Sequence, residues 1–441
     1  MKKKRIIIIG IIIILLIVGI ISVILLLKKD KNKELVYLSN GRLYFYNKKD
    51  NKELGRGELS SVVFSPKDHS IFLYKIENDL YLHNKKEEKI IENAKDYYFV
   101  EDKVVIIDID NKLNIYDKEL KEIEEKIDQF VGVSENLVLY IKDLELISYN
   151  AKDDKKETID DKVYAIHLTE DKKSVVNLKD TTLTKYDLNS NKEVELVKEV
   201  GLYNCDESCN KLYYLDKDNK LFYYDGKESK EIAEKVMMIQ KYDFQNNYVI
   251  YTKDGNKNYI YLTSKGEEKE LSDLTLPKDL KVSKEKIYYQ SYDGTIYTIN
   301  TKSLDIEKFK ENSFDNIHLT KNGFVYSAFE DEKNILYIDD KKIAENIIPS
   351  STIVDEKNDI IYYLKKEEEQ NNLYRYSKDK EELIDKNIYK YYALDNKEVY
   401  YIKDYKITKE YGDLYKYKKK AEKVLERVND IIGFKNLIEN K

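Results

Sequence analysis

The chain of 441 residues has no tryptophan and little cysteine, proline or glycine: two Cys, three Pro and 14 Gly. Two cysteines are too few for a disulfide-rich scaffold. So little glycine and proline excludes a collagen-like or other fibrous chain. Hydrophobic residues make up 42% of the sequence, which is too many for an intrinsically disordered protein. These absences leave a folded protein with an apolar core, and length alone suggests two or three domains at roughly 150 residues each.

An uncharged apolar run occupies residues 6–27, directly after four cations in residues 1–5. As a helix rising about 1.5 Å per residue, it matches the hydrocarbon core of a bilayer, which is about 30 Å thick. A cleaved signal peptide is the alternative, but it has a shorter apolar region and a small-residue cleavage site. Here three leucines lead straight into Lys28 and Lys29. We therefore predict a cytoplasmic N-terminus at 1–5, a transmembrane signal-anchor helix at 6–27 and a linker at 28–33.

Charge gives less information about orientation, because four cations flank each side of the apolar run. Long domains translocate largely regardless of their charge, so we expect residues 34–441 to be extracytoplasmic and the protein to be a single-pass protein of the cell membrane. The whole chain has a net charge of −6. Because the first 33 residues are cationic, the remainder is more acidic, near −13. Such a surface repels phosphate backbones, so nucleic acid is not an expected partner.

One sequence unit recurs throughout residues 34–441. Its most regular part is a short Tyr-rich strand, and the starts of its eleven copies lie 33 to 41 residues apart. The copies lie at 43–46, 80–83, 113–116, 146–149, 183–186, 221–224, 259–262, 296–299, 335–338, 373–376 and 414–417. A repeat of this length indicates an architecture in which identical small units pack side by side.

Each unit reads as four short antiparallel strands. An apolar strand precedes the Tyr-rich one, and Asn-Gly, Asp-Gly or Asp-Asn pairs join them at 40–41, 110–111, 218–219, 254–255 and 293–294. Those pairs tolerate the positive φ of tight hairpin turns. A further strand leads each unit and another ends it. Four strands about every 37 residues are typical of a β-propeller blade, so we predict an all-β propeller. Apolar residues in 421–431 have helical spacing, but their place in the repeat favours a strand.

Eleven blades exceed the usual four to eight, so the chain forms either one wide ring or two discs. The sequence does not decide between them. The first unit lacks a leading strand, whereas residues 430–434 at the other end of the chain resemble one. A C-terminal strand can therefore complete the first blade, which removes two exposed sheet edges.

Part of the repeat resembles a known family. Ser65-Pro66, within 62–74, resembles the Ser-Pro-Asp-Gly turn of TolB-like propellers. The recurrent Tyr-Tyr, turn and Leu-Tyr-x-Tyr pattern is similar to uncharacterised bacterial envelope propellers with one N-terminal membrane anchor. The resemblance implies a binding or scaffolding domain without enzymatic activity. The missing tryptophan argues against a WD40 repeat, a quinoprotein-type propeller or a sialidase Asp-box.

The chain has only four histidines, and two of them share a sequence motif. His167 and His318 each occupy the tetrapeptide Ile-His-Leu-Thr, 151 residues apart, in a leading strand. Leading strands line the central channel of a propeller, where two imidazoles can bind a metal or an anionic ligand. The alternative is ordinary strand histidines, because no third ligand recurs at a fixed spacing. Of the others, His69 is expected in a turn and His83 at the end of a Tyr-rich strand.

Cys205 and Cys209 flank the turn that follows a leading strand. They form either a small cross-hairpin disulfide or two free thiols. A disulfide requires a Cα separation of about 4.4–6.8 Å, and a zinc site would need two more ligands. The sequence leaves the choice between bonded and free cysteines open.

No catalytic motif is present in the sequence: it has no Gly-rich phosphate loop, Ser nucleophile elbow or His-Glu-x-x-His. The 41 tyrosines are expected to pack mainly between blades. We therefore expect a non-enzymatic, cofactor-free module that is held at the membrane by its N-terminal helix and binds a protein, peptide or glycan. The alternative is an envelope hydrolase or lyase with its site in the channel, near His167 and His318.

Overall fold

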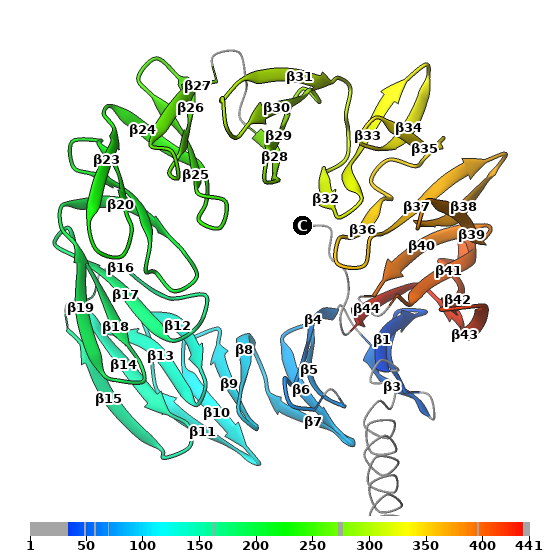
Figure 1. The fold of residues 1–441 in the computed structure, drawn as a ribbon. Coiled ribbons are helices and arrows are strands. Elements are labelled where there is room, and N and C mark those ends of the chain that lie inside the picture. The colour runs from blue at the N-terminus through cyan, green and yellow to red at the C-terminus, as the bar shows by residue number, and fades with distance from the viewer. Residues whose placement is uncertain are drawn as a thin grey trace, which may run out of the picture.

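The chain forms eleven four-stranded antiparallel sheets, which stand as blades around one axis in a single ring (Figure 1). The computed structural model describes residues 34–47, 50–56, 59–68, 70–161, 163, 165–271, 277–394 and 397–434. The all-β propeller predicted from the repeat is confirmed, and the structure selects one ring over two discs. The predicted anchor at 6–27 lies outside the described residues. Within the part described, no helix is long and apolar enough to cross a membrane.

Every blade has the same order of strands, and we number the blades along the chain from the one that contains β1. The first strands are β44 (Asp430–Phe434), β4 (Leu59–Phe64), β8 (Ala94–Val100), β12 (Gln129–Ser134), β16 (Ala165–Leu168), β20 (Val200–Cys205), β24 (Val236–Asp243), β28 (Pro277–Val282), β32 (His318–Thr320), β36 (Ile353–Asp355) and β40 (Ile388–Ala393). The second strands are β1 (Glu34–Ser39), β5 (Ile71–Ile76), β9 (Lys103–Asp108), β13 (Leu137–Lys142), β17 (Ser174–Lys179), β21 (Leu212–Asp216), β25 (Tyr248–Lys253), β29 (Lys286–Ser291), β33 (Gly323–Glu330), β37 (Ile360–Glu367) and β41 (Val399–Lys406).

The third strands are those that hold the Tyr-rich copies, and the fourth strands form the outer edge. The third strands are β2 (Arg42–Asn47), β6 (Asp79–Asn84), β10 (Leu113–Asp117), β14 (Glu145–Asn150), β18 (Thr182–Asp187), β22 (Leu221–Tyr224), β26 (Lys257–Leu262), β30 (Ile296–Asn300), β34 (Lys333–Ile338), β38 (Gln370–Ser377) and β42 (Tyr411–Tyr417). The fourth strands are β3 (Asp50–Arg56), β7 (Lys86–Ile91), β11 (Glu119–Glu124), β15 (Lys155–Asp160), β19 (Lys192–Val197), β23 (Ser229–Ala233), β27 (Glu267–Glu270), β31 (Ile306–Lys310), β35 (Lys341–Glu345), β39 (Lys380–Asp385) and β43 (Ala421–Val428). A short 3₁₀ helix, η1 (Ile407–Lys409), follows β41.

Blade 1 is closed by the C-terminal strand, as the sequence predicted. Its order is β3-β2-β1-β44, and β44 pairs antiparallel with β1, so that Leu35 lies opposite Phe434. The red and blue ends of the chain therefore share one sheet in Figure 1. Strand β43 shows that residues 421–428 are extended rather than helical, which was also the prediction. Pairing the two ends of the chain leaves blade 1 without an open inner edge.

Tight turns between the second and third strands adopt the backbone conformation that their sequences predicted. Asn40 and Gly41 have φ values of 52° and 68°. One residue in each of the other four predicted pairs also has positive φ: Asn111, Asn219, Gly255 and Gly294. Gly294 is also sterically required, because a Cβ there would lie 2.6 Å from the carbonyl oxygen of Ser313.

The core is divided into eleven hydrophobic clusters, each of which spans one interface between neighbouring blades. Between blades 3 and 4, for example, Leu113 and Ile115 pack with Val138 and Tyr140. Tyrosines such as Tyr140 and Tyr401 are fully buried. Some buried tyrosines direct their hydroxyls to carboxylates, as Tyr401 does toward Asp385 at 2.8 Å and Tyr363 does toward Glu381 at 2.5 Å. Packing thus accounts for much of the tyrosine content, because a blade buries its apolar surface against its neighbours.

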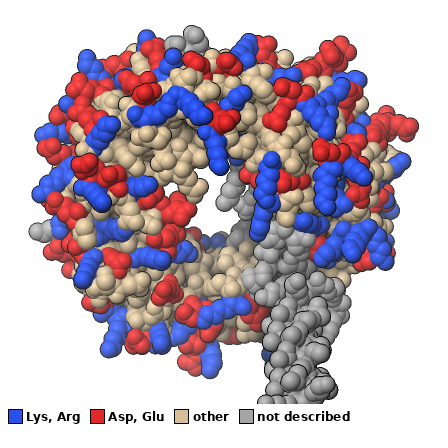
Figure 2. All heavy atoms as spheres, viewed as in Figure 1, with Lys and Arg blue, Asp and Glu red and all other residues tan. Residues whose placement is uncertain are grey.

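The ring has two unlike faces. Turns between first and second strands and between third and fourth strands form one face, which we call the turn face. Connections between blades and turns between second and third strands form the other. Because β1 begins beside the end of β44, both ends of the described chain lie at the turn face. On the face that Figure 2 shows, charged side chains of both signs are interspersed around a central opening.

Candidate functional site

The two histidines that share a motif lie in leading strands, as predicted, but in different parts of the ring. His167 belongs to β16 of blade 5 and His318 to β32 of blade 9. His318 is buried, and its Nδ1 lies 3.3 Å from Glu356 Oε1, a contact that lowers the pKa of that carboxyl. The structure does not bring the two imidazoles together. His83 is buried between phenylalanines, and His69 lies outside the described residues.

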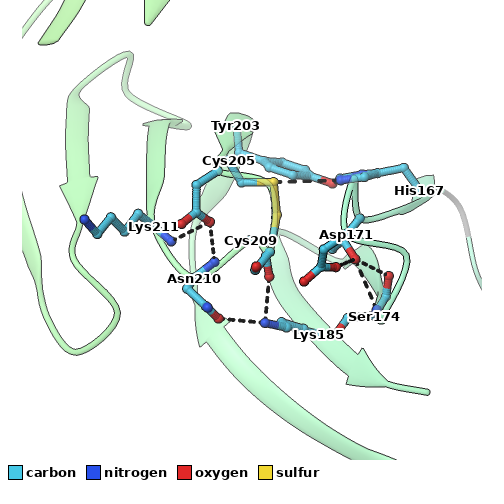
Figure 3. Close-up of a disulfide and its surroundings, with 12 residues drawn as sticks. His167, Asp171, Ser174, Lys185, Tyr203, Cys205, Cys209, Asn210 and Lys211 are labelled. Carbon is cyan, nitrogen blue, oxygen red and sulfur yellow. Dashed lines mark hydrogen bonds between the residues drawn. A yellow bond between two sulfur atoms is a disulfide. The ribbon is translucent and has the colours of Figure 1, made fainter. Parts of the chain in front are cut away.

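Cys205 and Cys209 are joined by a disulfide across the β20–β21 turn (Figure 3). Their Cα atoms are 4.8 Å apart, within the range that the bond requires. Cys209 is completely buried and belongs to the apolar cluster between blades 5 and 6, together with Val176 and Leu212. The disulfide therefore lies between a solvent-facing turn and the interface beneath it.

This disulfide turn, residues 205–209, is fixed to the neighbouring blade by polar contacts. Asp206 Oδ1 accepts hydrogen bonds from the backbone N–H groups of Asn210 at 2.6 Å and Lys211 at 3.2 Å. From blade 5, Lys185 Nζ donates to the Ser208 carbonyl oxygen and to Asn210 Oδ1, both at 2.7 Å. These bonds give the turn one defined position relative to blade 5.

His167 faces the disulfide from blade 5. Its Nδ1 lies 2.9 Å from the Tyr203 hydroxyl, and its Nε2 lies 3.8 Å from Cys205 Sγ. The two rings are stacked with centroids 5.7 Å apart. Burial lowers the pKa of His167 and raises that of Tyr203 to about 12, so both groups are neutral at pH 7. Tyr203 thereby orients one edge of the imidazole while the other edge faces sulfur (Figure 3).

A cleft of about 680 Å³ opens on the turn face between blades 6 and 7. We call it the blade 6–7 cleft, and the disulfide turn forms one of its walls. Its lining consists of Glu170, Cys205, Asp206, Glu207, Ser208, Lys211, Tyr242, Asp243, Phe244, Gln245 and Asn247. Three neighbouring blades contribute to it, because the β16–β17, β20–β21 and β24–β25 turns meet there.

The charge of this cleft is negative and poorly compensated. Four carboxylates line it, against the single cation Lys211. Among the described residues, none of the four has a Lys or Arg within ion-pair distance. Asp206 and Asp243 hold their own turns through backbone N–H groups. Glu170 and Glu207 make no such contact through their side chains in the described structure, so they are available to a cationic ligand.

An aromatic pair forms the apolar side of the cleft. Phe244 stacks on the buried Tyr213 of blade 6, with centroids 4.9 Å apart, and Tyr242 lies 5.5 Å from Phe244. Tyr242 remains 40% exposed. The strand that contains Tyr242 also places Met237 and Met238 on the inner wall of the ring, 57% and 52% exposed.

On the first strand of blade 6, Leu202 of β20 is likewise exposed, at 51%. Leu202, Met237 and Met238 are thus three large apolar side chains that half-face solvent on neighbouring innermost strands. We call these three residues the wall patch. All three precede the strand ends that line the blade 6–7 cleft, so they lie further along the inner wall, toward the opposite face of the ring.

Sequence reasoning did not find this cleft. Glu170, Glu207, Tyr242 and Phe244 look like ordinary strand-end and turn residues, because every blade has such residues. One signal pointed to the wall patch instead: apart from Met1, the only methionines of the chain are the adjacent pair in β24. A flexible thioether pair in a β-rich repeat otherwise built from Ile, Leu, Val and Tyr is out of pattern.

No family model and no curated protein matches this chain. Solved structures similar to it include the tricorn protease, at 12% identity over 89% of this chain and 57% of that one, with a TM-score of 0.29. A eukaryotic initiation factor matches at 10% identity over 80% and 96% of the two chains, with a TM-score of 0.40. A computationally designed protein, Ika8, matches at 14% identity over 64% and 96%, with a TM-score of 0.29. The chain thus spans little more than half of the tricorn protease chain, and its resemblance to TolB-like propellers stays a prediction.

Proposed function

We propose that this protein is a non-catalytic binding module for a polypeptide segment that carries both cationic and apolar side chains. The observation that carries the proposal is the blade 6–7 cleft, where Glu170 and Glu207 lie without ion-pair partners beside the exposed ring of Tyr242. A propeller suits binding because its rigid blades hold loops in place on two faces.

Apolar contacts and carboxylate–lysine contacts are expected to contribute differently to binding. Fully burying a large apolar side chain stabilises a complex by about 1.5–3 kcal/mol, so covering the exposed half of each wall-patch residue contributes about 1 kcal/mol. An exposed carboxylate–lysine contact contributes roughly 0.2–1 kcal/mol. We propose that a segment bound in the cleft continues along the inner wall over the wall patch, so that affinity comes mainly from the wall patch and the aromatic pair. The carboxylates select the sign of charge and speed the encounter.

We propose further that the propeller is held at the outer face of the cell membrane. The proposal follows from the uncharged run at 6–27, which has the length of a bilayer-spanning helix. The described part of the propeller begins with β1 at the turn face, which is also the face that carries the blade 6–7 cleft. Protease added to intact cells is expected to degrade residues 34–441. Degradation only after the cells are permeabilised would contradict an extracytoplasmic body.

The alternative of an envelope hydrolase or lyase would need His167 and His318 to act at one site. His167 and His318 lie on blades 5 and 9, and each contacts a different neighbour. We therefore keep the binding function as the proposal.

The binding proposal is tested with purified full-length protein in detergent and three fluorescent peptides of equal length. One alternates Lys with Leu, one alternates Glu with Leu, and one alternates Lys with Ser. The Lys-Leu peptide is expected to bind most tightly in fluorescence anisotropy, because it alone satisfies both surfaces. Met237→Ser with Met238→Ser is expected to weaken it about tenfold or more.

A matched pair of variants separates the cleft from general acidity. Glu170→Gln with Glu207→Gln is expected to weaken the Lys-Leu peptide about three- to tenfold at low salt. The control, Glu101→Gln with Glu135→Gln, removes the same charge from the cleft between blades 3 and 4. If the two pairs have the same effect, or if all three peptides bind alike, the proposed site is wrong. Binding of a glycan in place of all three peptides would also contradict it.

A further inference from the structure

Three potential metal ligands meet between blades 5 and 6. Ligand atoms of His167, Cys205 and Cys209 all lie within 4.8 Å of one another. In the described part of the chain, this is the one group of three or more His, Cys, Asp or Glu residues that is so close. The three come from two blades, so the ring itself assembles them. His318 shares the sequence motif of His167 but belongs to no such group of ligands among the described residues.

The distances suit a tetrahedral cation. Zinc binds thiolate at about 2.3 Å and imidazole at about 2.0–2.1 Å, which places the nitrogen and sulfur of two ligands about 3.6 Å apart. His167 Nε2 already lies 3.8 Å from Cys205 Sγ. In the oxidised protein the two sulfurs are bonded to each other. Once reduced, they separate to the roughly 3.8 Å of two zinc thiolates by side-chain rotation, since the turn already brings their Cα atoms to 4.8 Å.

The surroundings of His167 prepare it to act as a ligand. Tyr203 lies against Nδ1 at 2.9 Å, which leaves Nε2 directed at the sulfur. With a cation on Nε2, the ring proton resides on Nδ1 and is donated to the Tyr203 oxygen. Outer partners of this kind orient ligating histidines and raise metal affinity.

We propose that the reduced protein binds one divalent cation of the zinc class through the thiolates of Cys205 and Cys209 and through His167 Nε2. A water molecule completes the tetrahedron. A dithiol reductant converts the protein disulfide to two thiols and itself becomes a disulfide. The two protein thiols then lose two protons to solvent as the dication binds, so charge and electrons balance.

The cation and the disulfide exclude each other because both use the same two sulfurs. Oxidation of the site therefore releases the cation, and cation binding protects the thiols from oxidation. This inference does not depend on the partner that binds the blade 6–7 cleft.

Cobalt provides the test, because thiolate-bound Co²⁺ absorbs light and zinc does not. Full-length protein in detergent is reduced with a phosphine, freed of reductant under nitrogen and titrated with Co²⁺. One Co²⁺ per chain is expected, with a thiolate charge-transfer band that Zn²⁺ abolishes. The unreduced protein is expected to show no such band.

Two variants identify the third ligand. His167→Ala leaves both cysteines in place and is expected to weaken Co²⁺ binding at least about tenfold, because losing a ligand costs no less than losing an outer partner. The matched control His318→Ala changes the other copy of the motif and is expected to bind as the parent does. Circular dichroism of each variant verifies that the propeller is folded. The proposal is overturned if His167→Ala binds Co²⁺ as tightly as the parent, or if the unreduced protein gives the same band.

Discussion

The cleft between blades 3 and 4 and the blade 6–7 cleft are alike in construction and opposite in chemistry. Both lie on the turn face, with volumes of about 640 and 680 Å³. In the blade 3–4 cleft, Lys67 pairs with Glu101 and lies 3.4 Å from Asp102, and Lys103 lies 3.2 Å from Asp117. Three of the four carboxylates that line this cleft therefore have a lysine partner, and one of the two lysines, Lys67, comes from the preceding blade 2. The blade 6–7 cleft leaves its carboxylates unpaired and adds aromatic rings, which is what a site for a cationic, apolar ligand requires.

The aromatic side of the blade 6–7 cleft is expected to have the greatest effect when it is removed. Phe244→Ala loses the stacking on Tyr213 and is expected to lower the free energy of unfolding by about 2–3 kcal/mol, somewhat less than a fully buried Phe→Ala. Lys152→Ala in the blade 3–4 cleft changes an exposed side chain and is expected to cost under about 0.5 kcal/mol. Urea unfolding followed by circular dichroism measures both. Equal losses would mean that the two clefts do not differ in structure.

The disulfide is the second difference between the clefts. It closes a very short loop, so replacing both cysteines by serine is expected to lower the free energy of unfolding by about 2 kcal/mol. Adding a reductant is expected to destabilise the parent protein by a similar amount and to leave the double-serine variant unchanged. A parent protein whose urea midpoint does not respond to reductant would show that the bond does not support the cleft wall.

A single substitution is expected to make the blade 3–4 cleft more like the blade 6–7 cleft. Lys67→Met removes the cation that pairs with Glu101 and Asp102, and is expected to raise the affinity of the blade 3–4 cleft for a lysine-rich peptide about threefold at low salt. Glu101→Gln added to this variant is expected to cancel the gain. Calorimetric titration measures both. An unchanged affinity after Lys67→Met would show that pairing does not explain the contrast.

The smallest expected effect is on the free energy of unfolding at alkaline pH, through the single side chain of Tyr203. Burial raises the pKa of Tyr203 to about 12, so the folded protein holds this proton more tightly than the unfolded chain does. Its contribution to stability is complete below pH 10, the ordinary value for tyrosine, and is lost as pH rises from there through about 12. A tyrosinate absorbance titration of the parent against Tyr203→Phe measures this group. If the Tyr203→Phe variant lacks a titrating component near pH 10 rather than one near pH 12, the raised pKa of Tyr203 is contradicted.

Much of the blade was predictable from particular residues. Asn40-Gly41 and Asp293-Gly294 identified hairpin turns because few other pairs accept positive φ. The similarity of residues 430–434 to a leading strand predicted the closure of blade 1. The cleft was not predictable, because Glu170 and Tyr242 are unremarkable in their own blades. They acquire a role only where three turns from different blades converge.

The paired histidines teach the same lesson. Identical Ile-His-Leu-Thr tetrapeptides put His167 and His318 in the first strands of their blades. Their neighbours differ: His167 faces Tyr203 and Cys205, whereas His318 faces Glu356. A motif specifies the position of a residue within a blade but not the residues across the interface.

Local pattern is enough to dictate the four-stranded unit, its turns and the need for neighbours, because strand alternation and turn chemistry act within a few residues of each other. The single ring, the disulfide contact with His167 and the acidic, aromatic cleft arise from packing between blades. Side chains about 35 or more residues apart meet there, and their distances depend on how every blade is oriented against the next. The orientation of each blade depends on the complete set of interfaces around the ring, so it cannot be predicted from the sequence of one repeat.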